Sequence, residues 1–137
     1  MTLRRLAAPY FALQGALTLL WWAALFLRPP LRAYFQPPGG PEIHLLAFLP
    51  PDLLLFAGAS LAAAYAFARD AGWRSSAAWL VAGATTYAAL YGLALALATG
   101  AAWLSAVLML PAALCSLLFA TTANDDRHAD VSAGRAR

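Results

Sequence analysis

Three side chains near the middle of the chain have the chemistry to bind a ligand, a proton or a metal ion: Glu42, His44 and Asp52. Asp52 is the only acidic residue inside a long apolar stretch, and an ionisable group at such a place is a functional candidate by default. Its position directly after Pro50-Pro51 also suits the first turn of a helix, where free backbone amides favour a carboxylate. One histidine and two carboxylates can form a facial metal site, although this spacing matches no established ligand pattern. Helix start, proton or ligand contact, and metal ligand therefore stay open for Asp52.

A second group of polar and aromatic side chains lies inside the apolar stretches. A stripe at spacings of three and four residues runs along the first stretch, made of Tyr10, Gln14, Thr18, Trp21 and Trp22. At 1.5 Å per residue, the Gln14 amide lies about 12 Å from the start of its helix, so it needs an interhelical partner. Tyr87 falls at a similar depth, one turn before Tyr91. We expect Gln14 and Tyr87 to form a packing pair, and the alternative is that Gln14 lines a ligand cavity.

These residues together define one candidate pocket near the outer end of a helical bundle. Its members are Asp52, His44, Glu42, Arg28, Trp22 and Tyr91, with Gln14 and Tyr87 deeper in the bundle. In this arrangement the aromatic rings line an apolar slot, and Arg28 and Arg32 bind the polar head group of a lipid. No catalytic residue is identified, because the serines and Cys115 of the apolar stretches lie in segments that contain no histidine.

The composition indicates the class of protein that must position these residues. Of the 137 residues, 63% are hydrophobic and 11% are charged, and the mean hydropathy is +0.67. Soluble proteins average roughly 45–50% apolar and 25% charged residues. Four stretches, at about 6–27, 50–68, 77–98 and 101–121, have the ~20 apolar residues that a helix needs to cross a bilayer. We therefore expect an all-α polytopic membrane protein, a bundle of four transmembrane helices, followed by a disordered cytoplasmic tail at 122–137.

The connections and the small residues suggest how the helices are arranged. The segment 28–41 holds five prolines and cannot be a continuous helix. A short interfacial helix is expected from Pro41-Glu42 to about Phe48, ended by Pro50-Pro51. The connection at Thr99-Gly100 is a tight turn, which makes the third and fourth helices antiparallel neighbours. The second and third helices are expected to meet along stripes of small residues, namely Gly58, Ala62 and Ala66 against Ala84, Ala88, Gly92 and Ala96.

The charges indicate topology rather than a macromolecular ligand. All nine basic residues are arginine; seven fall on the side of the two termini and two, Arg28 and Arg32, on the other. The positive-inside rule then places both termini in the cytoplasm, in a plasma (inner) membrane of bacterial type. Nucleic acid is not an expected partner, because no clustered basic face is present. Cys115 is the single cysteine, which excludes an intrachain disulfide, and no cofactor motif occurs.

The sequence predicts a class of function rather than a specific activity. The polar residues are few and each has a structural explanation, which favours a non-enzymatic accessory or lipid-associated binding subunit with membrane lipids as partners. A homo-oligomer or a larger membrane complex is compatible with this class. The alternative is a membrane-embedded enzyme or carrier that acts on a lipid or isoprenoid through an outward-facing polar pocket.

Overall fold

The computed structural model describes the backbone of residues 4–135 and the side chains of residues 5–124, and within these limits the chain is helical without a strand. The elements are α1 (Arg4–Leu27), η1 (Pro29–Phe35), α2 (Glu42–Leu46), α3 (Leu49–Pro51), η2 (Asp52–Gly58), α4 (Ala59–Ala68), α5 (Arg74–Thr99) and α6 (Trp103–Arg135). Four helical segments of the described chain are long and apolar enough to cross a membrane: Arg5–Leu27, Glu42–Ala68, Arg74–Thr99 and Trp103–Asn124. The tail expected to be disordered falls mostly on residues 125–137, whose side chains lie outside the described residues.

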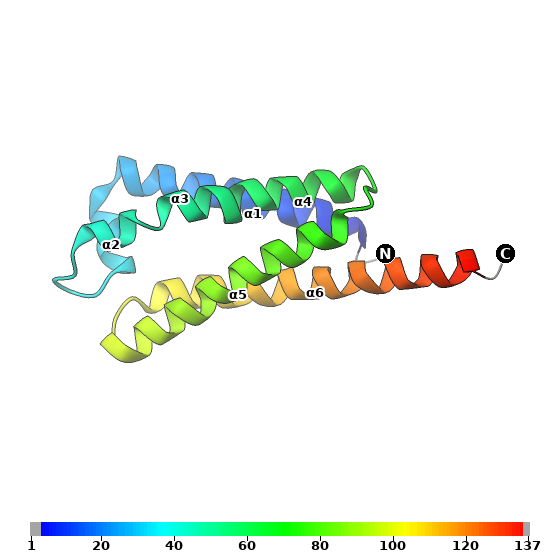
Figure 1. Ribbon diagram of the computed structural model, residues 1–137. Coiled ribbons are helices and arrows are strands. Elements are labelled where there is room, and N and C mark those ends of the chain that lie inside the picture. The colour runs from blue at the N-terminus through cyan, green and yellow to red at the C-terminus, as the bar shows by residue number, and fades with distance from the viewer. Residues whose placement is uncertain (1–3, 136–137) are drawn as a thin grey trace.

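The four long helices form two pairs, as Figure 1 shows: α1 lies along η2 and α4, and α5 lies along α6. The α5–α6 connection is the short turn that the sequence predicts. Gly100 adopts φ +67°, a conformation that favours glycine, and its amide donates to the carbonyl of Ala96 at 2.9 Å. The two helices therefore run antiparallel in extensive contact.

A close approach of two backbones explains how tightly α5 and α6 pack. A Cβ atom added at Gly92 would lie 3.4 Å from the backbone nitrogen of Ala106, so α6 crosses directly over this glycine. The prediction that Gly92 faces the second helix is therefore wrong. Ala62 and Gly58 of the predicted opposing stripe are exposed. Sequence spacing identifies a stripe of small residues, but it does not say which neighbour the stripe faces.

The two pairs converge at the end that holds the start of α1 and the α4–α5 connection (Figure 1). Their shared core is built from buried alanines, Val81 and two phenylalanines, Phe11 and Phe119. The Phe11 ring stacks on Phe67 of α4 at a centroid distance of 5.7 Å and contacts Phe119 of α6 at 5.9 Å. Small residues let the backbones approach here, and aromatic rings fill the remaining space.

Pro50 and Pro51 open the second long helix, as its predicted start at about residue 50 requires: they lie in the first turn of α3, where the missing amide hydrogens are not needed. The break lies earlier, at Ala47 and Phe48, which form a turn. After the prolines the chain continues directly into η2, a π-helical stretch from Asp52 to Gly58. Stretches of this wider helix are rare and frequently occur at functional sites.

Candidate functional site

A cavity of about 750 Å³ lies between the two helix pairs, on the side of the core where they diverge. It is lined by residues of α1, η1, α2, η2, α5 and α6. Its volume is within the range of about 300–1,000 Å³ that is usual for sites that bind small molecules. The walls are mainly leucine and aromatic side chains with a few polar groups at the two ends.

The cavity is open on the side between α1 and α6. Leu13, Leu17 and Leu20 of α1 and Leu108 of α6 line it, and each is between 47% and 65% exposed. Contacts between α1 and α6 are sparse. The opening is therefore flanked by apolar side chains along the length of two membrane-length helices.

The floor of the cavity is a polar network that joins three helices. Gln14 donates through Nε2 to the hydroxyl of Ser60 at 3.2 Å, and its Oε1 accepts from the hydroxyl of Ser116 at 3.2 Å. The Tyr10 hydroxyl donates to the carbonyl oxygen of Ala112 at 2.8 Å and lies 3.0 Å from the Ser116 oxygen. Ser60 and Ser116 are fully buried. The network ties α1 to α4 and to α6, which explains how an amide is accommodated at this depth.

The predicted Gln14–Tyr87 pair is wrong. Gln14 bonds to two serines, whereas Tyr87 is 68% exposed and lines a separate cavity of about 350 Å³ beside Asp52. Ser60 and Ser116 are the hydrogen-bond partners of Gln14 that sequence reasoning missed, and Tyr10 of the predicted stripe joins them through Ser116. The available signal was a serine in the middle of each of two apolar stretches, since a hydroxyl at such a place needs a bond.

Asp52 lies at the other end of the cavity and accepts a hydrogen bond from the indole of Trp22. The distance from Nε1 to Oδ2 is 3.0 Å, and Trp22 is only 3% exposed. Asp52 does lie in the first turn of the helix that begins after the turn at Ala47 and Phe48, as the sequence suggests. Its side chain caps no backbone amide of that turn, and its own amide donates to the carbonyl of Phe48 at 2.9 Å. The carboxylate points across to α1 instead of back to the amides of its own first turn.

Aromatic rings from the proline-rich segment and from α5 cover the Asp52 end. Phe35 of η1 contacts Trp21 edge-on at a centroid distance of 3.9 Å. Phe48 contacts Tyr91 of α5 at 5.2 Å. His44 of α2 lines the same end. The segment between α1 and η2 thus closes this end of the cavity with side chains from η1 and α2.

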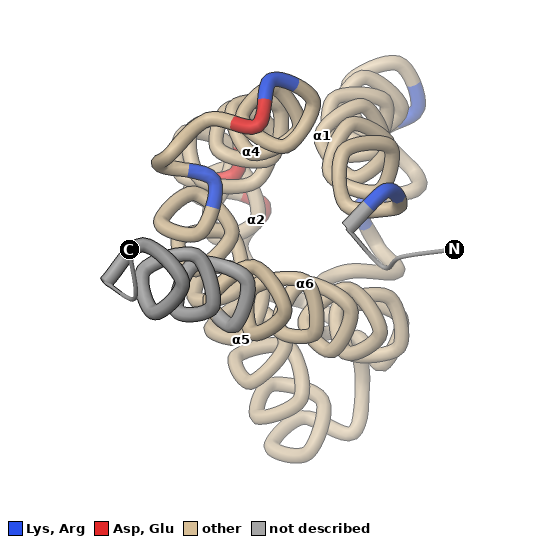
Figure 2. Tube along the Cα trace, turned by 90° about the vertical axis from the view of Figure 1, so that its right-hand side faces the viewer, with Lys and Arg blue, Asp and Glu red and all other residues tan. Residues whose placement is uncertain are grey.

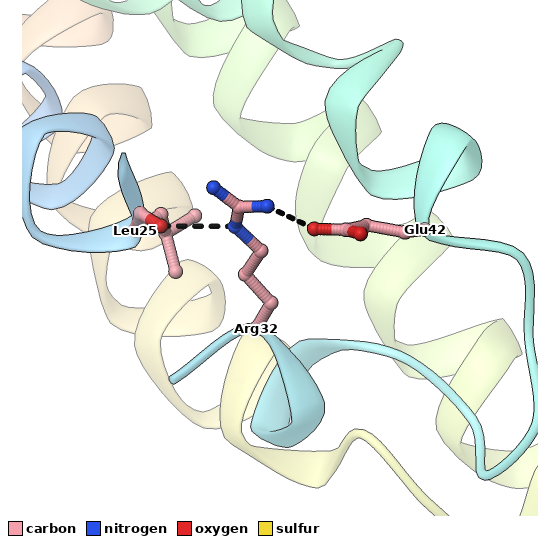
Figure 3. A network of polar contacts seen from close by, with 3 residues as sticks. All are labelled: Leu25, Arg32 and Glu42. Carbon is pink, nitrogen blue, oxygen red and sulfur yellow. Dashed lines mark hydrogen bonds and ion pairs between the residues drawn. The ribbon is translucent and has the colours of Figure 1, made fainter. Parts of the chain in front are cut away.

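An arginine holds this covering segment to α1, as Figure 3 shows. The Nε of Arg32 donates to the carbonyl oxygen of Leu25 at 2.9 Å, and its Nη1 forms an ion pair with Glu42. Leu25 lies in the last turn of α1, Arg32 in η1 and Glu42 in α2, so one guanidinium connects three elements. Neither Arg32 nor Glu42 lines the cavity, and Arg28 is exposed outside it.

The structure therefore brings together five of the eight candidate residues: Gln14, Trp22, His44, Asp52 and Tyr91 all line the large cavity. Tyr87, Arg28 and Glu42 do not. Among the described residues, no three His, Cys, Asp or Glu side chains are placed to hold a metal ion, so Glu42, His44 and Asp52 do not converge as ligands. Cys115 is a free thiol that lines the cavity and is exposed.

Comparisons of this chain with protein-family models, with curated proteins and with solved structures find no match.

Proposed function

We propose that this protein is a four-helix membrane protein that binds the apolar chain of a lipid in the cavity between its two helix pairs. The observation that carries the proposal is the cavity itself: about 750 Å³, walled by apolar side chains and open between two membrane-length helices. An apolar site that opens along such helices is accessible from hydrocarbon without passage through water. Binding alone is proposed, which corresponds to an accessory or lipid-associated binding subunit.

A membrane environment is supported by how little of the apolar surface is covered. In the most apolar window of each candidate span, between 17% and 33% of the residues are buried inside the protein. Large apolar side chains such as Leu54, Leu97 and Leu114 are 67% to 72% exposed. Hydrocarbon solvates such side chains without the free-energy penalty that water would impose. The short helix α2 would then lie at the membrane interface with Glu42 and His44.

The arginines support an orientation with the start of α1 in the cytoplasm. Figure 2 views the bundle from the end that holds the start of α1 and the α4–α5 connection, and blue segments lie there beside α1 and α4. Arg5, Arg69 and Arg74 belong to this end, whereas Arg28 and Arg32 belong to the opposite one. Cytoplasmic ends of membrane helices are enriched in basic residues. The Asp52 end of the cavity would then face the outer side.

Cys115 provides a direct test of lipid binding because it is the single cysteine and lines the cavity. The protein in mixed micelles is treated with a membrane-permeant maleimide, with and without a rising mole fraction of an 18-carbon single-chain lipid. A chain in the cavity covers the thiol, so the labelling rate should fall by about fivefold or more and saturate at one lipid per protein.

The matched control moves the thiol by one residue. Leu114 is 67% exposed and does not line the cavity, so a Leu114→Cys, Cys115→Ser variant should be labelled at the same rate with and without lipid. Equal protection of both thiols would mean that the lipid acts on the micelle as a whole. Unchanged labelling of Cys115 at saturating lipid would refute the proposed function.

A second candidate function, an enzyme or carrier that acts on a lipid or isoprenoid, is favoured by one observation. Asp52 and His44, a carboxylate and an imidazole, both line the same cavity. These are common proton-transfer groups. The two functions differ in outcome: mass spectrometry of the bound lipid after incubation shows an unchanged mass for a binding protein and a converted mass for an enzyme.

A further inference from the structure

The two polar ends of the cavity differ in the polar atoms that have no hydrogen-bond partner and can therefore bind a ligand. At the floor, the Nε2 and Oε1 atoms of Gln14 are each hydrogen-bonded to a serine, and both serines are fully buried. At the Asp52 end, Trp22 donates to Oδ2, and no described residue donates to Oδ1. The Oε1 atom of Gln36, which also lines the cavity, is buried without a hydrogen-bond partner. Asp52 Oδ1 and Gln36 Oε1 are therefore acceptors without a donor at this end, which His44 and Tyr91 also line.

The Asp52 end holds a carboxylate and an imidazole but no guanidinium. Among the described residues that line the cavity, Asp52 is the only acidic one, His44 is the only histidine and none is an arginine. The nearest guanidinium in the covering segment, that of Arg32, is already bonded to Leu25 and Glu42. A phosphate or carboxylate head group would find no guanidinium here and would lie against a carboxylate in a poorly screened site.

We infer that the bound lipid carries a head group that donates hydrogen bonds and has no negative charge, a primary alcohol or amine, and that this head group binds Asp52 and Gln36. The inference rests on the proposed function and specifies its ligand class. The volume of about 750 Å³ is that of a site for one drug-sized molecule, which fits a single apolar chain with a small head. The chain then lies along the leucines of α1 toward the floor.

The test compares three probes with the same 18-carbon chain: oleyl alcohol, oleylamine and oleic acid. The readout is protection of Cys115 from the permeant maleimide, at equal mole fractions in an uncharged detergent. For the wild-type protein, half-protection should need about tenfold less alcohol or amine than acid, the factor expected for one hydrogen bond to a charged group. Equal or stronger protection by oleic acid would overturn the inference.

Two variants assign the preference to the proposed acceptors. Asp52→Asn keeps the size of the side chain and removes its charge, so the preference for the amine over the acid should fall by about tenfold. Asp70→Asn removes a carboxylate from the α4–α5 connection at the opposite end and should leave the preference unchanged. A preference that survives Asp52→Asn would overturn the inference.

The outcomes separate the two claims. Protection by none of the three probes refutes the proposed function, whereas protection without head-group preference refutes only the inference. If Asp52→Asn does not fold, Gln36→Leu tests the head-group assignment instead, because Gln36 follows η1 and lies outside the long helices. It should lower the alcohol-over-acid preference several-fold, and an unchanged ratio would contradict the assignment.

Discussion

Replacement of Gln14 by leucine tests the network that holds α1 against α4 and α6. The change removes two side-chain hydrogen bonds, to Ser60 and from Ser116, and leaves the Ser60 hydroxyl without this partner. Hydrogen bonds between membrane helices average about 0.6 kcal/mol each, and a stranded buried hydroxyl adds to the loss. Gln14→Leu should therefore lower the free energy of unfolding by about 1–2 kcal/mol.

The assay is reversible unfolding in mixed micelles followed by tryptophan fluorescence. Combined with Ser116→Ala, Gln14→Leu should cost less than the two single losses added together, because both remove the same bond. The control is Thr121→Val, since the exposed Thr121 hydroxyl donates only to a carbonyl of its own helix, and its stability should stay within about 0.5 kcal/mol of wild type. A fully stable Gln14→Leu protein, or strictly additive losses, would refute the reasoning about this network.

Three further predictions address packing, the covering segment and topology. Gly92→Leu should destabilise the protein by about 1–3 kcal/mol, because the new side chain would meet the α6 backbone. Gly83→Leu is the control and should be tolerated, because no atom lies within 4 Å of a Cβ atom added there. Equal stabilities of the two variants in the unfolding assay would contradict the α5–α6 packing. Arg32→Ala should raise the rate of amide hydrogen exchange over residues 29–46, because the Arg32 guanidinium bonds η1 to α1 and α2. The exchange rate of the four long helices should not change. Unchanged exchange over residues 29–46 would show that Arg32 does not hold this segment to α1. In a cysteine-free background, an impermeant thiol reagent outside sealed cells should label Pro38→Cys and spare Gly72→Cys, and the reverse pattern would invert the orientation.

The helical class and the four membrane-length segments are the part of the structure that the sequence predicts well. Each segment is an apolar run long enough to cross hydrocarbon, and this property needs no knowledge of neighbours. The turn at Gly100 follows from local chemistry in the same way, because the residue has a positive φ angle. Predictions of this kind depend on residues that are close in sequence.

The candidate site was harder to predict because it depends on how each helix is rotated. The sequence predicts similar depths for Gln14 and Tyr87, but the structure places Tyr87 beside Asp52, away from the floor that holds Gln14. Depth also does not determine which face of α5 turns toward α1, and Tyr87 turns outward. The role of Asp52 was missed for a different reason. The two prolines before it do open a helix, but the hydrogen-bond partner of its carboxylate, Trp22, is 30 residues away. Hydrophobic periodicity contains no information about such long-range pairs.

The central claim, that a lipid chain occupies the cavity between the helix pairs, is tested most directly by native mass spectrometry of the protein extracted with its lipids. Leu108→Trp places a large side chain in the cavity, and Val107→Trp places the same side chain on an exposed position outside it. Wild type and Val107→Trp should each retain one lipid per chain, and Leu108→Trp should lose it. Absence of a bound lipid from wild type, or equal retention by Leu108→Trp, would contradict the claim.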